Sequence, residues 1–365
     1  MSFLLMIGVA IPGRAGFARE PHLPDINGTD GLAFIAGLPD GEVPLGKTLL
    51  LVSSLGRKGL DGETIDPDVV EKEIDRLADR IRPALADRKD PRDVISALNR
   101  FLFDREGFTY DCVAGNTDNY LLDRVIARRR GNCLGLTALY LALAERLSLP
   151  LYGVYVPSHC FVRYEGAGVR FNIETGDKGA EWENGRYLRE FGLAEGRPYL
   201  KSLGRKETVG VYLKSLGAAF SRRGMEAEAI DLYGMAAAFH PGLPDARFNL
   251  GVSYQKIGRL DEAVEEYRQA LVLDPGLAVA RGNLGVALAR KGLFIEALAE
   301  ARKATDLAPR STVSRGNLAA TLCACGMLEE GIREYRKILE IDPGNARSLS
   351  ALAERHRASS EASLP

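Results

Sequence analysis

One pattern of apolar and small residues recurs four times in the C-terminal part of the chain, with a period of 34 residues. The repeats span 210–243, 244–277, 278–311 and 312–345. Position seven is always Leu, position fifteen Gly and position thirty-two Pro, while positions eight and twenty are always Gly or Ala. This spacing predicts two apolar-faced helices per repeat that meet at the small residues. Gly is expected to end the first helix and Pro to break the second.

Helical periodicity also dominates the first part of the region from residue 60 to 205. Asp66 followed by Pro67 is typical of a helix start, and Pro83 is expected to kink or end that helix. Further helices are predicted over Pro91–Phe103, over Asn119–Ala127 and from Cys133 to a point before Pro150.

Three short runs rich in β-branched and aromatic residues come next, and they predict strands. The runs are Leu151–Val156, Cys160–Tyr164 and Val169–Ile173. Helices followed by a sheet indicate an α+β domain, which precedes the all-α repeat array.

Cys133 stands at the predicted start of an apolar helix, and three arginines at 128–130 precede it with Gly131 and Asn132 between. Unpaired amides and the positive end of the helix dipole favour a thiolate there, and nearby guanidinium groups act in the same direction. His159 and Glu174 follow on the predicted strands. A thiolate, an imidazole and a carboxylate in this order can form a nucleophilic triad.

The hairpin around Gly166 is expected to bring two of these residues together. With Gly166 as the first residue of a two-residue turn, the strand pairing sets His159 directly opposite Glu174. A longer loop moves Asn172 toward His159 instead, which makes Asn172 the alternative third member of the triad. A cysteine at a helix start and a histidine on a strand are also common as packing residues.

Five short segments between Asn119 and Gly179 carry a family resemblance. They are residues 119–125 (NYLLDRV), 129–137 (RRGNCLGLT), 147–150 (LSLP), 157–163 (PSHCFVR) and 172–175 (NIET). In these segments the chain resembles bacterial transglutaminase-like proteins of the SirB type, over roughly residues 40–200. The resemblance implies a papain-like fold, in which a Cys at a helix start meets a His and an acid from adjacent strands.

By that resemblance Cys133 is the nucleophile, His159 the general base and acid, and Glu174 the orienting acid, although the family's acid is more often Asp. The backbone amide of Cys133 would supply one oxyanion donor. Asn119 is a supporting residue that either assists there or caps the following helix. Neither a cofactor nor a metal is implied.

The repeat array closely resembles the tetratricopeptide repeat (TPR), whose period and small-residue pattern it shares. Such solenoids bind extended peptides or partner helices in a concave groove. Two polar positions recur in repeats two to four and are the candidate groove residues. They are Arg247, Arg281 and Arg315 at position four, and Asn249, Asn283 and Asn317 at position six. Asn at position six is also simply typical of the repeat.

Composition narrows the choice of partners. The chain of 365 residues has 48 Lys and Arg against 49 Asp and Glu, so it lacks the basic excess expected of a nucleic-acid-binding protein. No apolar stretch is long enough to span a bilayer. The five cysteines are odd in number and sparse, which argues against a disulfide framework, and no His/Cys cluster has zinc-site spacing.

Residues 41–48 (GEVPLGKT) match the P-loop pattern letter for letter. A phosphate cradle needs a strand before the loop and a helix after it. Bulky Val43, Pro44 and Leu45 suit a glycine-rich cradle poorly, and the SirB-type resemblance makes Lys47 onward part of a helix. We therefore expect no nucleotide at this segment.

The predicted domain boundaries follow from these segments. Residues 1–18 combine an apolar run with a small-residue cleavage pattern but lack a preceding basic residue, so a signal peptide with export to the periplasm and a cytoplasmic location stay equally open. A transglutaminase-like domain is expected over 19–205 and four TPR units over 206–347. A capping helix with a disordered tail is expected over 348–365.

Two hypotheses for function follow. In the first, the protein is a cysteine-dependent acyl-transfer enzyme acting on amide bonds of proteins or peptides, as protease, amidase or transamidase, and the repeats recruit a partner. In the second, the protein is a non-catalytic interaction scaffold with a degenerate transglutaminase-like domain, because some SirB-type proteins lack the cysteine.

Overall fold

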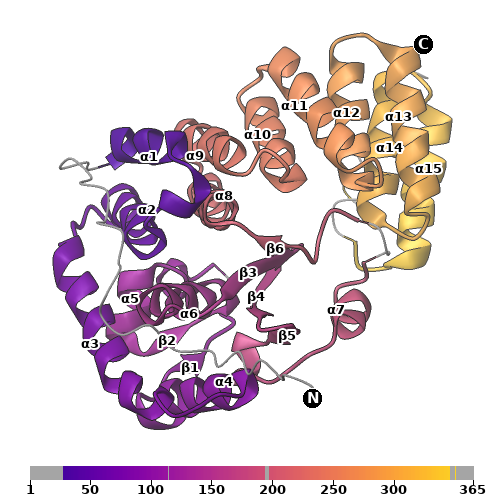
Figure 1. Ribbon diagram of the computed structural model, residues 1–365. Helices are drawn as coiled ribbons and strands as arrows, with labels where there is room; N and C mark the ends of the chain where they lie inside the picture. Colours follow the sequence, from indigo (N-terminus) through magenta and orange to yellow (C-terminus); the bar gives the residue numbers. More distant parts are fainter. Residues whose placement is uncertain (1–27, 114, 194–196, 346–349, 351–365) are drawn as a thin grey trace, which may run out of the picture. The chain divides into compact units, whose positions relative to one another are not determined.

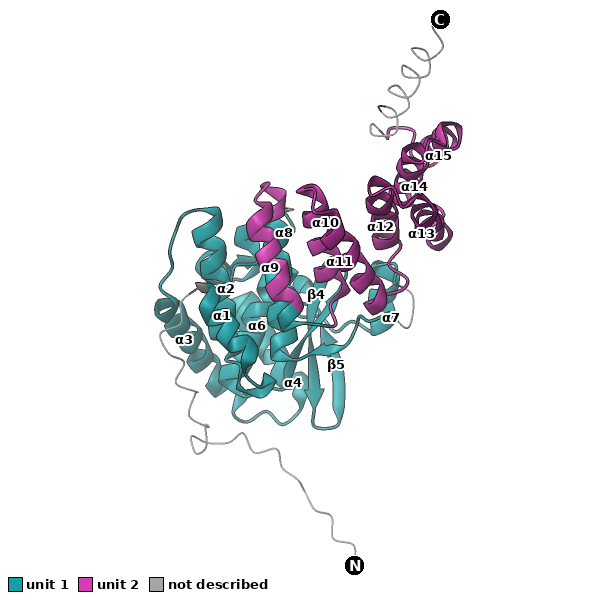
Figure 2. Cartoon of the chain, turned by 90° about the horizontal axis from the view of Figure 1, so that it is seen from above, with its two compact units in different colours: residues 1–220, 238–241 teal, residues 221–237, 242–365 magenta. Residues whose placement is uncertain are grey.

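The chain divides into two compact units in the computed structural model, which describes residues 28–113, 115–193, 197–345 and 350 (Figure 2). Unit 1 comprises residues 1–220 and 238–241, and unit 2 comprises residues 221–237 and 242–365. The predicted signal peptide (1–18) lies outside the described residues. So do the predicted capping helix and tail (348–365), apart from residue 350.

The first part of unit 1 is helical (Figure 1). Its main elements are α1 (Gly28–Gly37), α2 (Leu45–Leu60), α3 (Pro67–Leu85), α4 (Pro91–Asn99), a π-helical turn (Arg100–Arg105), α5 (Leu122–Arg128) and α6 (Cys133–Leu147). The side chains of Asp66 and Asp90 cap α3 and α4 by accepting hydrogen bonds from backbone amides two residues on, at 3.0 and 2.8 Å. The predicted helix starts at Pro67 and Pro91 are confirmed.

One helix continues past the proline that was expected to kink or end it, and one predicted helix start is wrong. α3 continues through Pro83 and ends at Leu85. Because Pro83 lies in the last turn, it removes only one backbone hydrogen bond, and the helix gains the burial of Leu85, which is 4% exposed. α5 begins at Leu122 rather than Asn119, because Thr117–Asn119 form a separate 3₁₀ turn that the Asn116 side chain caps.

An antiparallel sheet follows the helices, with strand order β5-β4-β3-β6. The strands are β3 (Leu151–Val156), β4 (His159–Gly166), β5 (Val169–Ile173) and β6 (Ser202–Leu203). The three predicted strands are confirmed, although β4 is longer at both ends than expected. Two further short strands, β1 (Thr109–Tyr110) and β2 (Arg130–Gly131), pair in parallel just before α6.

α6 is the central helix of unit 1. It packs against β3 and β4 and also against α2, α3 and α5, which explains why it is apolar on nearly every face. Gly135 permits its close approach to the preceding loop, since a Cβ at this position would lie 2.2 Å from the carbonyl oxygen of Asn119. The packing therefore fixes the N-terminus of α6, where Cys133 lies.

Two later helices complete unit 1. They are α7 (Asn184–Glu190) and α8 (Arg205–Arg222). By sequence α8 opens the first repeat, yet its Tyr212 hydroxyl donates a hydrogen bond to the carbonyl of Leu134 at the start of α6. Phe220 of α8 lies against Gly59 of α2. The beginning of the repeat array is thus part of the packing around the central helix.

Unit 2 consists of helical hairpins. Its elements are α9 (Glu226–Phe239), α10 (Pro244–Lys256), α11 (Leu260–Leu273), α12 (Ala278–Arg290), α13 (Phe294–Leu307), α14 (Thr312–Ala324) and α15 (Leu328–Ile341). The helix pairs predicted for repeats two to four pack as expected, and Gly258, Gly292 and Gly326 end first helices with φ of 84°, 79° and 81°. An α+β domain followed by an all-α repeat solenoid is confirmed.

Candidate active site

Cys133 is the first residue of α6, and the chain around it is held by short-range contacts. The Asn132 side chain caps the helix by accepting from the amide of Gly135 at 3.0 Å. The Asn132 amide in turn donates to the carbonyl of Asn119 at 2.7 Å. The amide of Cys133 has no acceptor within the described part of the chain, so it is free to donate to a ligand oxygen.

His159, at the start of β4, lies against a buried carboxylate. Its Nε2 is 2.8 Å from Oε2 of Glu174, which is 2% exposed. Glu174 also accepts from the amide of Gly176 at 2.8 Å and from the hydroxyl of Tyr187 at 3.0 Å. With Nε2 engaged in this way, Nδ1 is the ring nitrogen left to face the thiol.

The thiol and the imidazole shift each other's ionisation. Burial opposes a charge on His159, but hydrogen bonds and charges from Cys133 and Glu174 outweigh it and raise the pKa of His159 to about 9. The pKa of the Cys133 thiol is held well below its usual value by a hydrogen bond from Cys160 and, against the effect of burial, by the hydrogen bond and charge of His159. These opposed shifts favour a thiolate facing an imidazolium over a neutral pair.

Cys160 is a contributor that the sequence did not single out. It is 5% exposed and lies on the face of β4 that packs against α6. Burial, followed by the neighbouring Cys133, raises the pKa of the Cys160 thiol well above its usual value. It therefore keeps its proton and can donate to the Cys133 sulfur.

An aromatic cluster surrounds the imidazole. The Phe191 ring stacks on His159 with centroids 4.8 Å apart, and Tyr187 stacks on Phe161 at 3.8 Å. Burial, followed by the charge of Glu174, raises the pKa of Tyr187, so its hydroxyl stays protonated and donates to the carboxylate. Tyr187 and Phe191 come from the region of α7, and only their spacing of four residues hinted at a shared helix face.

The predicted hairpin register is wrong, while the predicted contact between His159 and Glu174 is present. The turn residues are Ala167 and Gly168, with φ of 52° and 75°, and Gly166 pairs with Val169. This moves the pairing by two positions, which keeps every side chain on its predicted face. Glu174 reaches His159 diagonally from just beyond β5 instead of from directly opposite.

Neither supporting asparagine takes the role foreseen for it in orienting the imidazole or capping a helix. Asn172 pairs with Arg163, and its amide donates to the carbonyl of Trp182 at 2.8 Å. Asn119 is fully buried and donates to the carbonyl of Asp111 at 3.4 Å, while α5 has no side-chain cap. Asn119 instead steadies the chain that leads into Cys133, through the bond from Asn132.

The candidate groove residues of unit 2 fall into two sets with different contacts. Each position-four arginine pairs with a glutamate nineteen residues later in its own repeat. The pairs are Arg247–Glu266 at 3.1 Å, Arg281–Glu300 at 2.7 Å and Arg315–Glu334 at 2.8 Å. At position six, Asn317 donates to Asn283 at 2.8 Å, while Asn249 is half-buried on α10.

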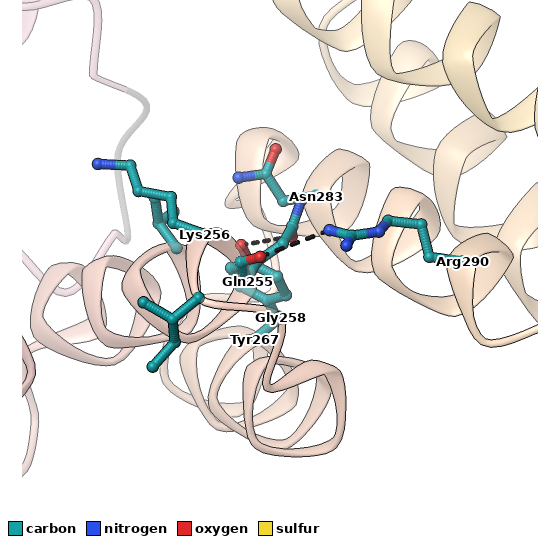
Figure 3. A pocket seen from close by; sticks show the side chains of 8 residues that line it. Gln255, Lys256, Gly258, Tyr267, Asn283 and Arg290 are labelled. Atoms are coloured by element: carbon teal, nitrogen blue, oxygen red, sulfur yellow. Dashed lines mark hydrogen bonds between the residues drawn. The ribbon is translucent and has the colours of Figure 1, made fainter. Parts of the chain in front are cut away.

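A cavity of about 460 Å³ is lined in part by Asn283, the acceptor in this pair. Figure 3 shows Lys256, Asn283 and Arg290 among its lining residues, with Tyr267 donating to Gln255 at 2.9 Å. The lining is mainly polar and comes from α10, α11 and α12. Polar donors of this kind can bind the backbone carbonyls of an extended peptide.

The segment that resembles a P-loop has a different role. The amides of Leu45 and Gly46 at the start of α2 donate to the two carboxylate oxygens of Glu145, at 3.0 and 2.9 Å. The element before this helix start is the 3₁₀ turn Asp40–Glu42, not a strand. The protein's own carboxylate thus occupies the position that a phosphate takes in a P-loop.

Among the described helices, none is long and apolar enough to cross a membrane.

Comparisons with known families agree with the two units. Residues 68–190 match the transglutaminase-like superfamily, and residues 244–277 match the tetratricopeptide repeat. Unit 1 therefore contains a transglutaminase-like domain, and unit 2 contains TPR repeats.

Individual relatives are more distant. A UPF0162 protein of Xylella fastidiosa (strain Temecula1) is 31% identical over 136 residues, which cover 35% of this chain and 44% of the relative. A UPF0162 protein of Vibrio cholerae is 26% identical over 179 residues, covering 47% and 66%. The chain thus spans less than half the length of the Xylella relative. The solved structure of YrrB, a TPR protein with an unusual peptide-binding site, is 21% identical with a TM-score of 0.34, covering 40% of this chain and 79% of YrrB.

Proposed function

We propose that unit 1 is a cysteine-dependent acyl-transfer enzyme of the SirB type that acts on amide bonds of proteins or peptides. Cys133 is the nucleophile, His159 the general base and acid, and Glu174 the acid that orients the imidazole. The observation that carries the proposal is the buried His159–Glu174 pair at 2.8 Å, coupled to a thiol whose pKa is lowered and an imidazole whose pKa is raised to about 9. Such opposed shifts are typical of activated nucleophile pairs.

The reaction follows from these protonation states. The Cys133 thiolate attacks the carbonyl carbon, and the resulting oxyanion accepts a hydrogen bond from the Cys133 amide. The His159 imidazolium gives its proton to the departing amine, which leaves a thioester on Cys133. Water or a second amine then attacks the thioester, and His159 takes up the proton from this nucleophile. Hydrolysis gives an acid, and transfer to an amine gives a new amide.

We further propose that the repeats, over residues 206–347, bring a protein or peptide partner to the enzyme through the groove. The Asn283–Asn317 pair and the polar cavity beside it supply donors for the backbone of an extended segment. The position-four arginines are each ion-paired with a glutamate of the same repeat, so we assign them a structural role in the repeats rather than direct binding of the partner.

Selective labelling tests the catalytic part of the proposal. A thiol with the usual pKa near 8.5 is only about 0.3% thiolate at pH 6, whereas the lowered pKa of Cys133 gives it a larger thiolate fraction at the same pH. Iodoacetamide should therefore label Cys133 about tenfold or more faster than the exposed Cys112 at pH 6, even though a low pKa also reduces intrinsic nucleophilicity. Peptide mass spectrometry measures both rates in the same sample.

In the same experiment, His159→Ala should slow the labelling of Cys133 toward the rate of Cys112, because the partner charge is lost. Cys112 serves as the internal reference, and an unchanged melting transition shows that the variant is folded. Equal rates for the two cysteines in the natural chain would contradict activation and would leave the non-catalytic scaffold as the better account.

A further inference from the structure

A second cavity of unit 1 contains an arginine that the proposed chemistry does not use. Arg163 lies on β4, on the same strand face as His159, and is 1% exposed. It lines a cavity of about 240 Å³ together with Arg170, Phe171, Asn172, Trp182 and Asn184. Since strands rise about 3.3 Å per residue, Arg163 is about 13 Å along β4 from His159.

The hydrogen-bond partners of this guanidinium are all neutral. Its Nε donates to Asn172 Oδ1 at 2.7 Å, and Nη2 donates to Asn184 Oδ1 at 3.0 Å. Nη1 donates to the carbonyl of Leu200 at 2.9 Å and to the Ser202 hydroxyl at 3.4 Å. Within the described ranges no carboxylate forms an ion pair with Arg163. A buried cation usually has such a partner, because desolvation of an unpaired charge is costly.

The cavity lining carries two arginines and two glutamates, and two of these four charges are already paired with residues outside it. Glu165 attracts Arg163, but its carboxylate accepts from the Ser202 hydroxyl at 2.6 Å and pairs with Arg170 at 3.5 Å. Burial, followed by the like charge of Arg170, lowers the pKa of Arg163 to about 10. Glu181, which also lines the cavity, binds Arg92 through two hydrogen bonds of 3.0 Å, so its charge is already balanced. Glu183 is exposed and screened by water.

Free donors remain beside the cation. Asn184 Oδ1 accepts from both Arg163 and Asn172, at 3.0 Å each, which fixes the amide and leaves its NH₂ group available. Four of the five guanidinium N–H groups of Arg163 are used, and one on Nη2 is not. The Leu200 carbonyl is presented from a left-handed backbone with φ of 62°, a conformation that a Leu adopts only where its surroundings enforce it.

We propose that this cavity is a binding site for a carboxylate of a peptide, either an acidic side chain or a free chain end. The carboxylate accepts from Arg163 Nη2, the Asn184 amide and the Arg170 guanidinium, and the Phe171 and Trp182 rings form apolar walls beside it. A hydrogen bond from a guanidinium to a carboxylate is charge-assisted and therefore stronger than one between neutral groups. The proposal does not depend on the reactivity of Cys133.

The chain contains its own reporter for this site, because Trp182 is the only tryptophan and lines the cavity. The full chain is titrated with N-acetylglutamic acid α-amide, which offers a side-chain carboxylate, and with N-acetylglycine, which offers a chain-end carboxylate. N-acetylglutamine amide is the uncharged control. We expect a saturable change in tryptophan fluorescence with at least one carboxylate, and the tighter of the two identifies the source.

Arg170→Gln should weaken that binding about tenfold or more, because a hydrogen bond to a charged partner contributes about 1.5–3 kcal/mol. Arg170 is exposed, so the variant should fold. Arg76→Gln is the matched control, since the Arg76 side chain is 73% exposed and far from this cavity's lining. The proposal is overturned by the absence of a saturable change with both carboxylates, by equal binding of the uncharged amide, by equal binding of inorganic phosphate, or by full affinity in Arg170→Gln.

Discussion

Glu174 is the residue on which the proposed catalytic groups converge. Its two oxygens accept from His159, Tyr187 and the Gly176 amide, all at 2.8 to 3.0 Å. Because the carboxylate is 2% exposed, these donors replace the water that would otherwise solvate it. The carboxylate then holds the imidazole in one orientation, with the second ring nitrogen toward Cys133.

Tyr187 is a positioning residue for this carboxylate. Tyr187→Phe keeps the stacking on Phe161 but removes one donor from the oxygen that also binds His159. The carboxylate then attracts the imidazolium more strongly, so the pKa of His159 should rise from about 9 by about 0.5. NMR titration of the imidazole measures this value, and the chain has only four histidines to assign.

The sign of the change separates this role from simple packing. Loss of the imidazolium as pH rises would begin at a higher pH in Tyr187→Phe than in the natural chain. A merely structural role would loosen the ion pair, so the pKa of His159 would fall or stay unchanged. Tyr164→Phe is the matched control, because Tyr164 is also buried in the sheet and its ring stacks on Phe171 rather than beside Glu174.

At the scale of elements, the site depends on where α6 begins. The Asn132 cap and the close approach at Gly135 hold the helix start against the loop of Asn119. A Cβ at Gly135 would lie 2.2 Å from a backbone oxygen, and a backbone atom cannot move away as a flexible side chain can. The position of Cys133 is thus set by a backbone contact.

Gly135→Ala should therefore destabilise the protein by about 1–3 kcal/mol, although Ala is favoured over Gly inside a helix by up to about 1 kcal/mol. Gly234→Ala in α9 is the control, because a Cβ there meets nothing within 4 Å, and it should stabilise the chain slightly. Denaturant unfolding measures both. A Gly135→Ala variant as stable as Gly234→Ala would contradict the role given to the backbone contact.

Most helix starts and strands could be predicted from the sequence, because the residues that determine them are neighbours in the chain. Asp66 with Pro67 marked a helix start, and the apolar runs bounded by Pro150 and Gly166 marked strands. The hairpin register could not be fixed, since either pair of residues around Ala167 can supply a two-residue turn.

Contacts between segments that lie far apart in the sequence could not be predicted, because they depend on how the elements pack. Tyr187 reaches Glu174 and Arg163 reaches Leu200 across long sequence separations, and neither residue belongs to a motif. Cys160 lies on a predicted strand, but its effect on the Cys133 thiol depends on how α6 packs on β4. The candidate triad could be predicted only because a helix start gives the place of Cys133 and a hairpin brings His159 and Glu174 close together.

At the scale of the whole molecule, the chain joins a transglutaminase-like domain to TPR repeats. The first helix of the array, α8, packs on the central helix of unit 1 through the bond from Tyr212 to Leu134. The helix that opens the repeat array therefore packs, within unit 1, beside the residue that follows Cys133.

Groove binding predicts a specific loss of affinity. Asn283→Ala removes the acceptor of Asn317 and one donor beside the cavity shown in Figure 3, so affinity for a partner of the repeats should fall about tenfold, or about 1.4 kcal/mol. Gln269→Ala, an exposed change outside this cavity's lining, should have no effect. Calorimetry measures both, and unchanged affinity in Asn283→Ala would contradict binding at this place.

The most direct test of the account is to trap the acyl intermediate on the full chain. After acid quenching of a reaction with a mixture of peptide amides, mass spectrometry should find an acyl group on Cys133 as a thioester, absent in Cys133→Ser and sharply reduced in His159→Ala. A chain that turns over amides while Cys133 carries no acyl group, or that forms the adduct equally well without His159, would contradict the proposed catalytic triad.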